Sequence, residues 1–271
     1  MGTSKRASED EVLGNIKCYE PFSLSGRVAL VTGGNRGIGR AISRGLADAG
    51  AEVVIAGRSL TACEEVVKEI VQAGGKAVAA PTDMGVQADR AHLIELIRER
   101  FGFLDILVNN AAVLRPHVTL KITEEELDEL ISVNLKGPVF LSRDAVPLLE
   151  VRGNASIVNV SALGAFQPMA GIGGYSAVKA ALVNWTATMA MEWASRGIRV
   201  NCLVPGPVAT DMILPKDPVA RDGFISEIGG KSLLGRIAQP AELVGAVIFL
   251  ASGASSLMTG RSLFVDGGML P

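Results

Sequence analysis

The stretch VALVTGGNRGIG, residues 28–39, decides the fold of this chain. Its apolar beginning predicts a buried strand, and its glycines predict a sharp turn that leads into a helix. Ile38, Ile42 and Leu46 recur every four residues, which is the spacing of an apolar helix stripe. The start of a helix presents free N–H groups and a partial positive charge. The stretch therefore predicts a strand, a turn that can hold a pyrophosphate, and a helix.

The rest of the chain repeats this alternation of strand and helix. Six further apolar runs predict strands: Val53–Ala56, Ala77–Ala80, Ile106–Val108, Ile157–Val160, Ile198–Leu203 and Leu263–Val265. Helical patterns also cover Ala91–Phe101, Glu124–Leu149, Tyr175–Ala194 and Pro240–Ala251. Runs that are apolar throughout are typical of parallel strands covered on both faces. We therefore predict a single α/β domain of the Rossmann type, with a doubly wound parallel sheet of about seven strands and helices on both faces.

The domain limits follow from where these patterns begin and weaken. Residues 1–22 are predicted to be an N-terminal extension that is partly disordered. Residues 23–271 are predicted to be the single domain, because no linker or shift in composition divides them. Residues 211–234 fit the alternation least, and we expect them to be an insertion over one end of the sheet.

Composition argues against several classes of protein. The net charge is −2 with both signs interspersed, so we expect no nucleic-acid partner. Cys18, Cys63 and Cys202 lie too far apart for a disulfide framework or a metal site, and predict reduced thiols in a cytoplasmic protein. Residues 153–178 carry no charge, but polar residues and glycines interrupt them. That segment therefore predicts a buried core segment and no membrane span. The polar first ten residues indicate no secretory signal peptide.

Two arginines indicate which dinucleotide the turn would hold. The second predicted strand ends at Ala56-Gly57-Arg58, where a site that prefers NAD usually has an acidic residue for the ribose hydroxyls. Arg58 stands there instead, and Arg36 lies in the phosphate-binding turn. Guanidinium groups form charge-assisted hydrogen bonds with phosphates. We therefore expect NADP(H), with the two arginines at its 2′-phosphate.

Tyr175 and Lys179 are the predicted centre of the chemistry. They lie four residues apart, so a helix would place them on one face. A phenol is a poor base at neutral pH because its pKa is near 10, and a nearby ammonium stabilises the phenolate. This pair can therefore donate a proton to an oxygen atom or accept one from it.

The order of several motifs resembles that of the short-chain dehydrogenase/reductase family, from Leu24 to the C-terminus. The motifs are Thr32–Gly39, Asp83, Asn109-Asn110-Ala111, Asn134, Ser161, Tyr175 with Lys179, Pro205-Gly206 with Thr210, and Val265-Asp266-Gly267-Gly268. The resemblance implies an oxidoreductase that moves a hydride between NADP(H) and a carbonyl/alcohol pair of a small molecule. We expect no metal in this reaction.

The same resemblance assigns roles to individual residues. The catalytic residues would be Asn134, Ser161, Tyr175 and Lys179. Tyr175 would be the acid or base, Lys179 would lower its pKa and hold the nicotinamide ribose, Ser161 would bind the substrate oxygen, and Asn134 would help to anchor a water that relays the proton. The cofactor-binding residues would be Gly33, Asn35, Arg36, Gly37, Ile38, Gly39, Arg58, Asp83, Met84, Asn110, Ala111, Tyr175, Lys179, Pro205, Gly206, Val208 and Thr210. Residues 211–234 would form a lid over the substrate.

One departure from the family pattern leaves two alternatives. The family's serine usually lies thirteen residues before the tyrosine, where this chain has Ala162. Ser161 is one residue earlier, but it keeps the Ser-x-x-Gly spacing to Gly164. Either a one-residue insertion after Gly164 restores the serine, which we favour, or the site has no serine. The second case would suit a catalytically weakened sensor or scaffold that binds a dinucleotide.

Substrate and assembly are predicted only in outline. The apolar residues of the insertion indicate a partly apolar pocket. The opening Phe22–Arg27 and the pair Arg115-Pro116 resemble members of the gluconate 5-dehydrogenase type. The family resemblance also implies a homotetramer. Its contacts would involve the Glu124–Leu149 and Tyr175–Ala194 helices and the C-terminal region. The uncharged run Ala180–Met191 fits a buried interface.

Overall fold

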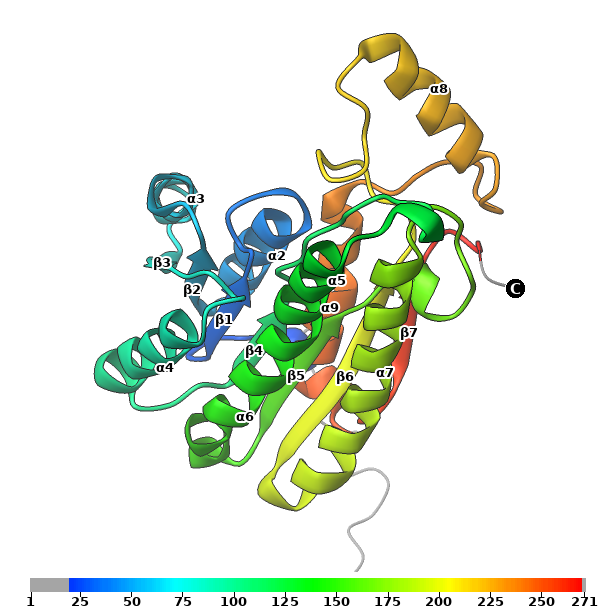
Figure 1. The fold of residues 1–271 in the computed structure, drawn as a ribbon. Helices are drawn as coiled ribbons and strands as arrows, with labels where there is room; N and C mark the ends of the chain where they lie inside the picture. Colours follow the sequence, from blue (N-terminus) through cyan, green and yellow to red (C-terminus); the bar gives the residue numbers. More distant parts are fainter. Residues whose placement is uncertain (1–19, 270–271) are drawn as a thin grey trace, which may run out of the picture.

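A seven-stranded parallel sheet forms the centre of the computed structural model, which describes residues 20–269 (Figure 1). The strand order is β3-β2-β1-β4-β5-β6-β7. The strands are β1 Val28–Thr32, β2 Glu52–Gly57, β3 Lys76–Pro81, β4 Ile106–Asn109, β5 Ala155–Val160, β6 Ile198–Pro205 and β7 Ser262–Val265. The predicted Rossmann-type α/β fold is confirmed, and each predicted strand lies within an observed one.

Helices cover both faces of the sheet. The α-helices are α2 Gly37–Asp48, α3 Leu60–Gln72, α4 Gln87–Phe101, α5 Glu124–Ile131, α6 Gly137–Leu149, α7 Gly173–Trp193, α8 Pro218–Gly229 and α9 Val244–Ala251. Short 3-10 turns are η1 Glu20–Phe22, η2 Thr119–Lys121, η4 Glu150–Arg152, η5 Leu163–Ala165, η6 Ala194–Arg196, η7 Pro240–Leu243 and η8 Gly253–Ser255; η3, Ser132–Lys136, is a π-turn.

The two faces have separate apolar cores. On one face, Ala29 and Val31 of β1 belong to a buried cluster with residues of α2, α3 and α9. On the other, Val28 and Leu30 belong to a cluster with residues of α4, α6 and α7. Successive side chains of a strand point to opposite faces, so an apolar strand supplies both clusters. This arrangement explains why the predicted strands are apolar throughout.

A buried carboxylate ties together the end of the sheet opposite the strands' carboxyl ends. Asp105 comes just before β4 and accepts hydrogen bonds from the Val28 N–H (2.8 Å), Arg27 Nη1 (3.1 Å) and Arg152 Nη1 (3.3 Å). Because the carboxylate is buried, these donors replace the water that it loses.

Three segments differ from the expectations. Helix α3 was not among the predicted helices, although Ser59 caps its start by accepting a hydrogen bond from the Ala62 N–H. The predicted helix Glu124–Leu149 is interrupted by the π-turn η3. Residues 20–22 of the expected extension form η1, which lies against η8, and residues 1–19 lie outside the described part of the chain.

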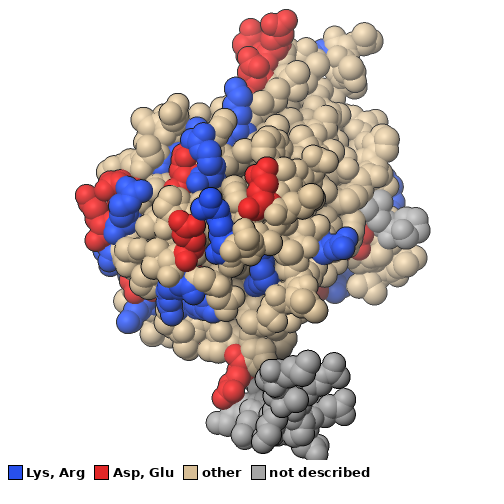
Figure 2. All heavy atoms as spheres, turned by 90° about the horizontal axis from the view of Figure 1, so that it is seen from below, with Lys and Arg blue, Asp and Glu red and all other residues tan. Residues whose placement is uncertain are grey.

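The surface charge, the helix lengths and the placement of possible metal ligands can be compared with what nucleic-acid, membrane and metal binding require. Figure 2 shows the side opposite α8, where acidic and basic side chains are interspersed. Among residues 20–269, no helix is long and apolar enough to cross a membrane. Over the same residues, no group of three or more His, Cys, Asp or Glu side chains is placed to hold a metal ion.

Candidate active site

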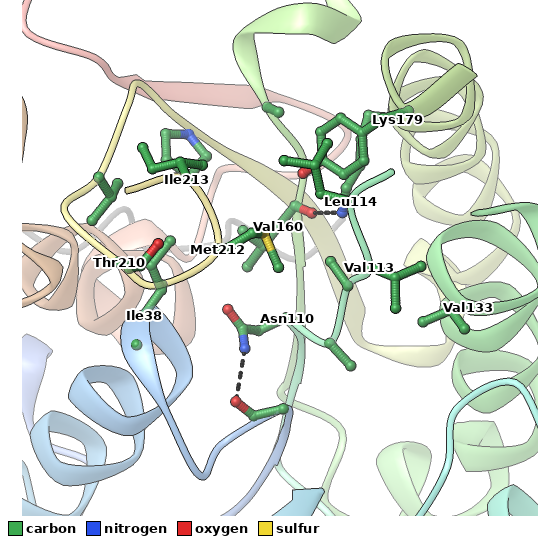
Figure 3. A pocket seen from close by; sticks show the side chains of 18 of the residues that line it. Ile38, Asn110, Val113, Leu114, Val133, Val160, Lys179, Thr210, Met212 and Ile213 are labelled. Atoms are coloured by element: carbon green, nitrogen blue, oxygen red, sulfur yellow. Dashed lines mark hydrogen bonds between the residues drawn. The ribbon is translucent and has the colours of Figure 1, made fainter. Parts of the chain in front are cut away.

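A cavity of about 1380 Å³ lies at the carboxyl ends of the strands. Its floor includes the segments that follow β1, β4 and β5 (Figure 3). β1 lies between β2 and β4, so the chain's order across the sheet reverses beside it. In open parallel sheets, ligands bind outside the carboxyl ends of the strands at such a switch point.

The glycines of the turn after β1 are required by the backbone. Gly33 and Gly37 have φ angles of +62° and +50°, which residues with side chains rarely adopt. A Cβ on Gly39 would lie 2.0 Å from the Gly33 carbonyl oxygen. Arg36 precedes α2 without any side-chain cap, so the first N–H groups of the helix face the cavity uncapped. These features fit the pyrophosphate of a dinucleotide.

Asn110 and Thr32 lock this turn to β4. Asn110 Nδ2 donates to the carbonyl oxygens of Thr32 (2.9 Å) and Gly33 (3.2 Å). The Thr32 hydroxyl in turn accepts the N–H groups of Asn110 (3.0 Å) and Ala111 (3.1 Å). The amide of Asn110 is therefore used to shape the wall of the cavity, as Figure 3 shows.

Arg36 and Arg58 stand at the cavity without partners. Both line it and both are exposed, and within residues 20–269 neither side chain makes a hydrogen bond or an ion pair. The neighbouring Arg40 and Arg44 instead contact Glu69, at 3.1 Å and 3.8 Å. Two free guanidinium groups beside the phosphate-binding turn favour a ligand with an additional phosphate.

Lys179 and Tyr175 project from the first turns of α7. Lys179 is buried, and its Nζ donates to the Val160 carbonyl oxygen at 2.7 Å (Figure 3). This Nζ lies 5.7 Å from the centroid of the Tyr175 ring, which keeps some exposure to the cavity. Burial raises the pKa of Tyr175 to about 12 and lowers the pKa of Lys179 to about 8. Both shifts favour the neutral groups, so Tyr175 retains the proton that a reduction needs.

Ser161 lies directly after β5, against the same helix. Its buried Oγ donates to the Lys179 carbonyl oxygen at 3.2 Å, and both Ser161 and Ala162 line the cavity. A Cβ on Gly164 would come within 2.3 Å of Ser176 Oγ. Glycine at that position thus lets the Ser161–Gly164 segment lie against α7. This contact gives a structural reason for the Ser-x-x-Gly spacing.

Asn134 lies behind the cavity wall, in the π-turn η3. It is buried, its Oδ1 accepts the Val113 N–H at 2.8 Å, and its Nδ2 donates to the Val113 carbonyl oxygen at 2.9 Å. The side-chain amide thus holds the segment that continues from β4.

The remaining wall comes from the segment after β6 and from the insertion. Gly206 passes so close to Asp266 that a Cβ would lie 2.8 Å from the Asp266 Cα. Val208 is buried, and Thr210 lies near Gly37 of the phosphate-binding turn. Beyond Thr210, α8 stands above the carboxyl ends of the strands (Figure 1), and Phe224 and Ile228 line the cavity.

The structure brings nearly all predicted site residues to this one cavity. The residues that line it are Gly33, Asn35, Arg36, Gly37, Ile38, Gly39, Arg58, Asp83, Met84, Asn110, Ala111, Ser161, Tyr175, Lys179, Pro205, Gly206, Val208 and Thr210. Sequence reasoning missed Val113 and Val160, whose backbones bind Asn134 and Lys179. No side-chain signal marks them, because only their main-chain atoms take part.

The fold and the site define a dinucleotide-binding α/β enzyme, and comparisons with known proteins agree. Residues 33–270 match the family model described as enoyl-(acyl carrier protein) reductase. The chain is 38% identical to a 3-oxoacyl-[acyl-carrier-protein] reductase of Synechocystis, over 92% of this chain and 98% of that protein. It is 37% identical to a gluconate 5-dehydrogenase of Gluconobacter oxydans, over 92% and 96%.

Solved structures give the same result. A gluconate 5-dehydrogenase from Burkholderia cenocepacia, in complex with NADP and tartrate, has a TM-score of 0.87 at 34% identity, with 93% of this chain and 98% of that chain covered. A 3-oxoacyl (acyl-carrier-protein) reductase from Agrobacterium tumefaciens with NADP bound has a TM-score of 0.88 at 34% identity and the same coverage. This chain therefore belongs to the short-chain dehydrogenase/reductase family of oxidoreductases, and the predicted family and enzyme class are confirmed.

Proposed function

We propose that this enzyme transfers a hydride between NADP(H) and a carbonyl/alcohol pair of a small molecule. The observation that carries the proposal is the position of Tyr175, Lys179 and Ser161 on one wall of the cavity whose other end is the glycine turn. NADP bound to the two neighbouring structures supports the choice of cofactor. Arg36 and Arg58, which have no partner within residues 20–269, support it independently.

The residues of this chain would divide the work as follows. The bound nicotinamide supplies or accepts the hydride. Ser161 would turn its single O–H from the Lys179 carbonyl oxygen to the substrate oxygen, and Tyr175 would deliver the proton to that oxygen in reduction. In oxidation, Tyr175 must first lose its proton, which burial opposes. Lys179, and the positive charge of an oxidised nicotinamide, would reverse part of that shift.

The cofactor would lie along the cavity from Arg58 to Lys179. Its phosphates would be held by the turn from Gly33 to Gly39, and Asp83 and Met84 would border the adenine with Asn110 and Ala111. The segment from Pro205 to Thr210 would border the nicotinamide. We propose residues 211–234 as the lid that completes the substrate site.

Assembly and location extend the proposal. We propose a homotetramer, because apolar side chains on α6 and α7 are exposed in one chain: Phe140 at 37%, Trp185 at 43% and Met191 at 85%. Light scattering that gives a stable monomer at micromolar concentration would refute it. A cytoplasmic location is supported by Cys63 and Cys202, which are buried free thiols whose pKa burial raises to about 11.

A sensor or scaffold that binds NADP(H) but turns over poorly is the second candidate, because Ala162 also faces the cavity. The deciding experiment follows NADPH absorbance with a panel of ketones, for the natural enzyme and for Tyr175→Phe. We expect turnover that Tyr175→Phe reduces by about two orders of magnitude or more, with NADPH binding retained. NADPH binding without turnover of any ketone would favour the sensor.

A further inference from the structure

The part of the cavity beyond the proposed cofactor residues combines an apolar wall with a few charged side chains. Leu114 and Ile172 line it near Tyr175, and Met212, Ile213, Phe224 and Ile228 line it from the insertion. Apart from the proposed catalytic residues, Gln167 is a neutral polar side chain on this wall. A carbonyl compound that reaches Tyr175 must therefore place its body among apolar groups.

Lys231, the basic side chain of the insertion that lines the cavity, has a carboxylate partner, as does Arg115 beside the cavity. Arg115 forms a two-point pair with Glu129, at 2.8 Å and 2.7 Å, and Lys231 pairs with Glu227 at 2.9 Å. Asp128 and Asp211 also line the cavity, and within residues 20–269 neither carboxylate has a hydrogen-bond or ion-pair partner. The mouth of the substrate region thus carries unpaired negative charge.

We infer that the substrate is an uncharged ketone with an apolar body, or the corresponding secondary alcohol. This inference rests on the proposed function. A sugar acid or a keto acid would lose hydration of its carboxylate without gaining a cation, and would meet two like charges. We therefore do not expect this chain to share the gluconate substrate for which some of its relatives are named.

The test compares one ketone in a charged and an uncharged form. We would measure kcat/KM with NADPH for methyl 4-acetylbenzoate and for 4-acetylbenzoate, and expect the ester to be favoured at least tenfold. In Asp211→Lys the preference should fall severalfold, whereas Lys68→Glu, a change of similar size on α3, should leave it as it is. A preference for the acid would overturn the inference.

Binding distinguishes this inference from the proposed function. Calorimetry of both compounds with the NADP⁺-loaded enzyme reports the preference even if neither is turned over. Binding of the ester without turnover would refute the proposed activity but support the inferred substrate class. Turnover of both compounds, with equal or tighter binding of the acid, would support the proposed activity but refute the inferred substrate class.

A second and independent observation concerns His117, in the loop after β4. Its Nδ1 lies 2.7 Å from the Arg115 carbonyl oxygen, and its Nε2 faces the Gly174 N–H at 3.4 Å. The first contact requires a proton on Nδ1, and the second requires a bare Nε2. Only the neutral ring with Nδ1 protonated makes both contacts.

Gly174 is the second residue of α7 and the one directly before Tyr175. Ile172, the residue that precedes this helix, makes no side-chain cap bond, so the His117 ring caps the helix from another segment. A Cβ on Gly174 would come within 3.1 to 3.3 Å of Ile122, Leu130 and His117. His117 also donates its backbone N–H to Gly171 at 2.7 Å.

We propose that neutral His117 is a positioning residue that fixes the start of α7 and so the Tyr175 hydroxyl. A protonated ring would present an N–H to the Gly174 N–H and lose the contact. The charged groups closest to it in sequence are Arg115 on its own loop, which pairs with Glu129 of α5, and Lys121 of η2. The 166–174 segment carries no charge.

The chain's two histidines make this testable, because His92 is exposed on α4 and serves as a matched control. The kcat and KM of His92→Gln should equal those of the natural enzyme. His117→Gln keeps an acceptor for the Gly174 N–H, so it should retain most of kcat at pH 8.

His117→Leu completes the series. We expect it to lower kcat roughly tenfold at pH 8, with KM for NADPH and the unfolding temperature little changed, because a small displacement of a catalytic group is costly. Natural kcat in His117→Leu, or a loss of kcat in His117→Gln as large as in His117→Leu, would overturn the proposal.

Discussion

Replacing Arg58 by aspartate should reverse the enzyme's preference between the two dinucleotides. The guanidinium is exposed at the cavity and has no partner within residues 20–269, so it is available to the 2′-phosphate at no cost to another interaction. A hydrogen bond to a charged group contributes about 1.5–3 kcal/mol, and the exposure of Arg58 places it near the lower end of that range. Arg36 would still hold part of the phosphate.

The expected result is therefore a loss of about tenfold in NADPH affinity, increased by repulsion from the new carboxylate. NADH affinity should stay the same or rise, because aspartate can accept hydrogen bonds from the ribose hydroxyls. Calorimetric titration of both dinucleotides, at two salt concentrations, measures the effect and its screening.

Arg44→Asp is the control for net charge. Arg44 lies on the same helix as the phosphate-binding turn, but it contacts Glu69 and is not part of the cavity wall. An equal loss of NADPH affinity in both variants would show that general electrostatics account for the effect. Equal affinities of the natural enzyme for NADPH and NADH would refute the reasoning altogether.

Three further predictions concern the proton donor, the serine and the scaffold. In the unliganded enzyme, the absorbance difference between the natural protein and Tyr175→Phe should show no tyrosinate below about pH 10, because burial raises the pKa of Tyr175 to about 12; tyrosinate below pH 9 contradicts the buried phenol. Ser161→Ala should lower turnover by roughly two orders of magnitude with little change in NADPH affinity, and intact turnover would show that the site works without a serine. Asp105→Ala should destabilise the fold by about 3 kcal/mol, because two arginines and the Val28 N–H lose their shared acceptor; a thermal melt unchanged within 1 °C would exclude that role.

The sequence predicts the sheet well because burial on both faces makes each strand apolar throughout. It predicts the walls of the cavity for a related reason: residues that follow parallel strands meet at one edge of the sheet. Helix α3 was also within reach, since Ser59 is a typical capping residue and Val66 and Ile70 share a face.

Contacts between distant segments were not predictable in the same way. The hydrogen bonds of Asn134 with Val113 and of Lys179 with Val160 involve backbone atoms that leave no mark in the sequence. The sequence indicates only that His117 lies in a loop, and the contact of its ring with the start of α7 becomes visible in the folded structure. The π-turn was also not predictable, because one additional residue within a helix leaves the local spacing of apolar residues looking helical.

That additional residue has a consequence for how this helical segment can vary. A π-turn holds one residue more than the α-helical turn that it replaces, so deleting one residue between positions 132 and 136 would leave a continuous α-helix with α5 and α6 still in place. Leu130 and Leu141, both fully buried on either side of the turn, would keep facing the core. Deleting a second residue would rotate α6 by about 100° relative to α5 and carry one of the two leucines out of the core. Homologous chains should therefore tolerate the loss of one residue here but not of two.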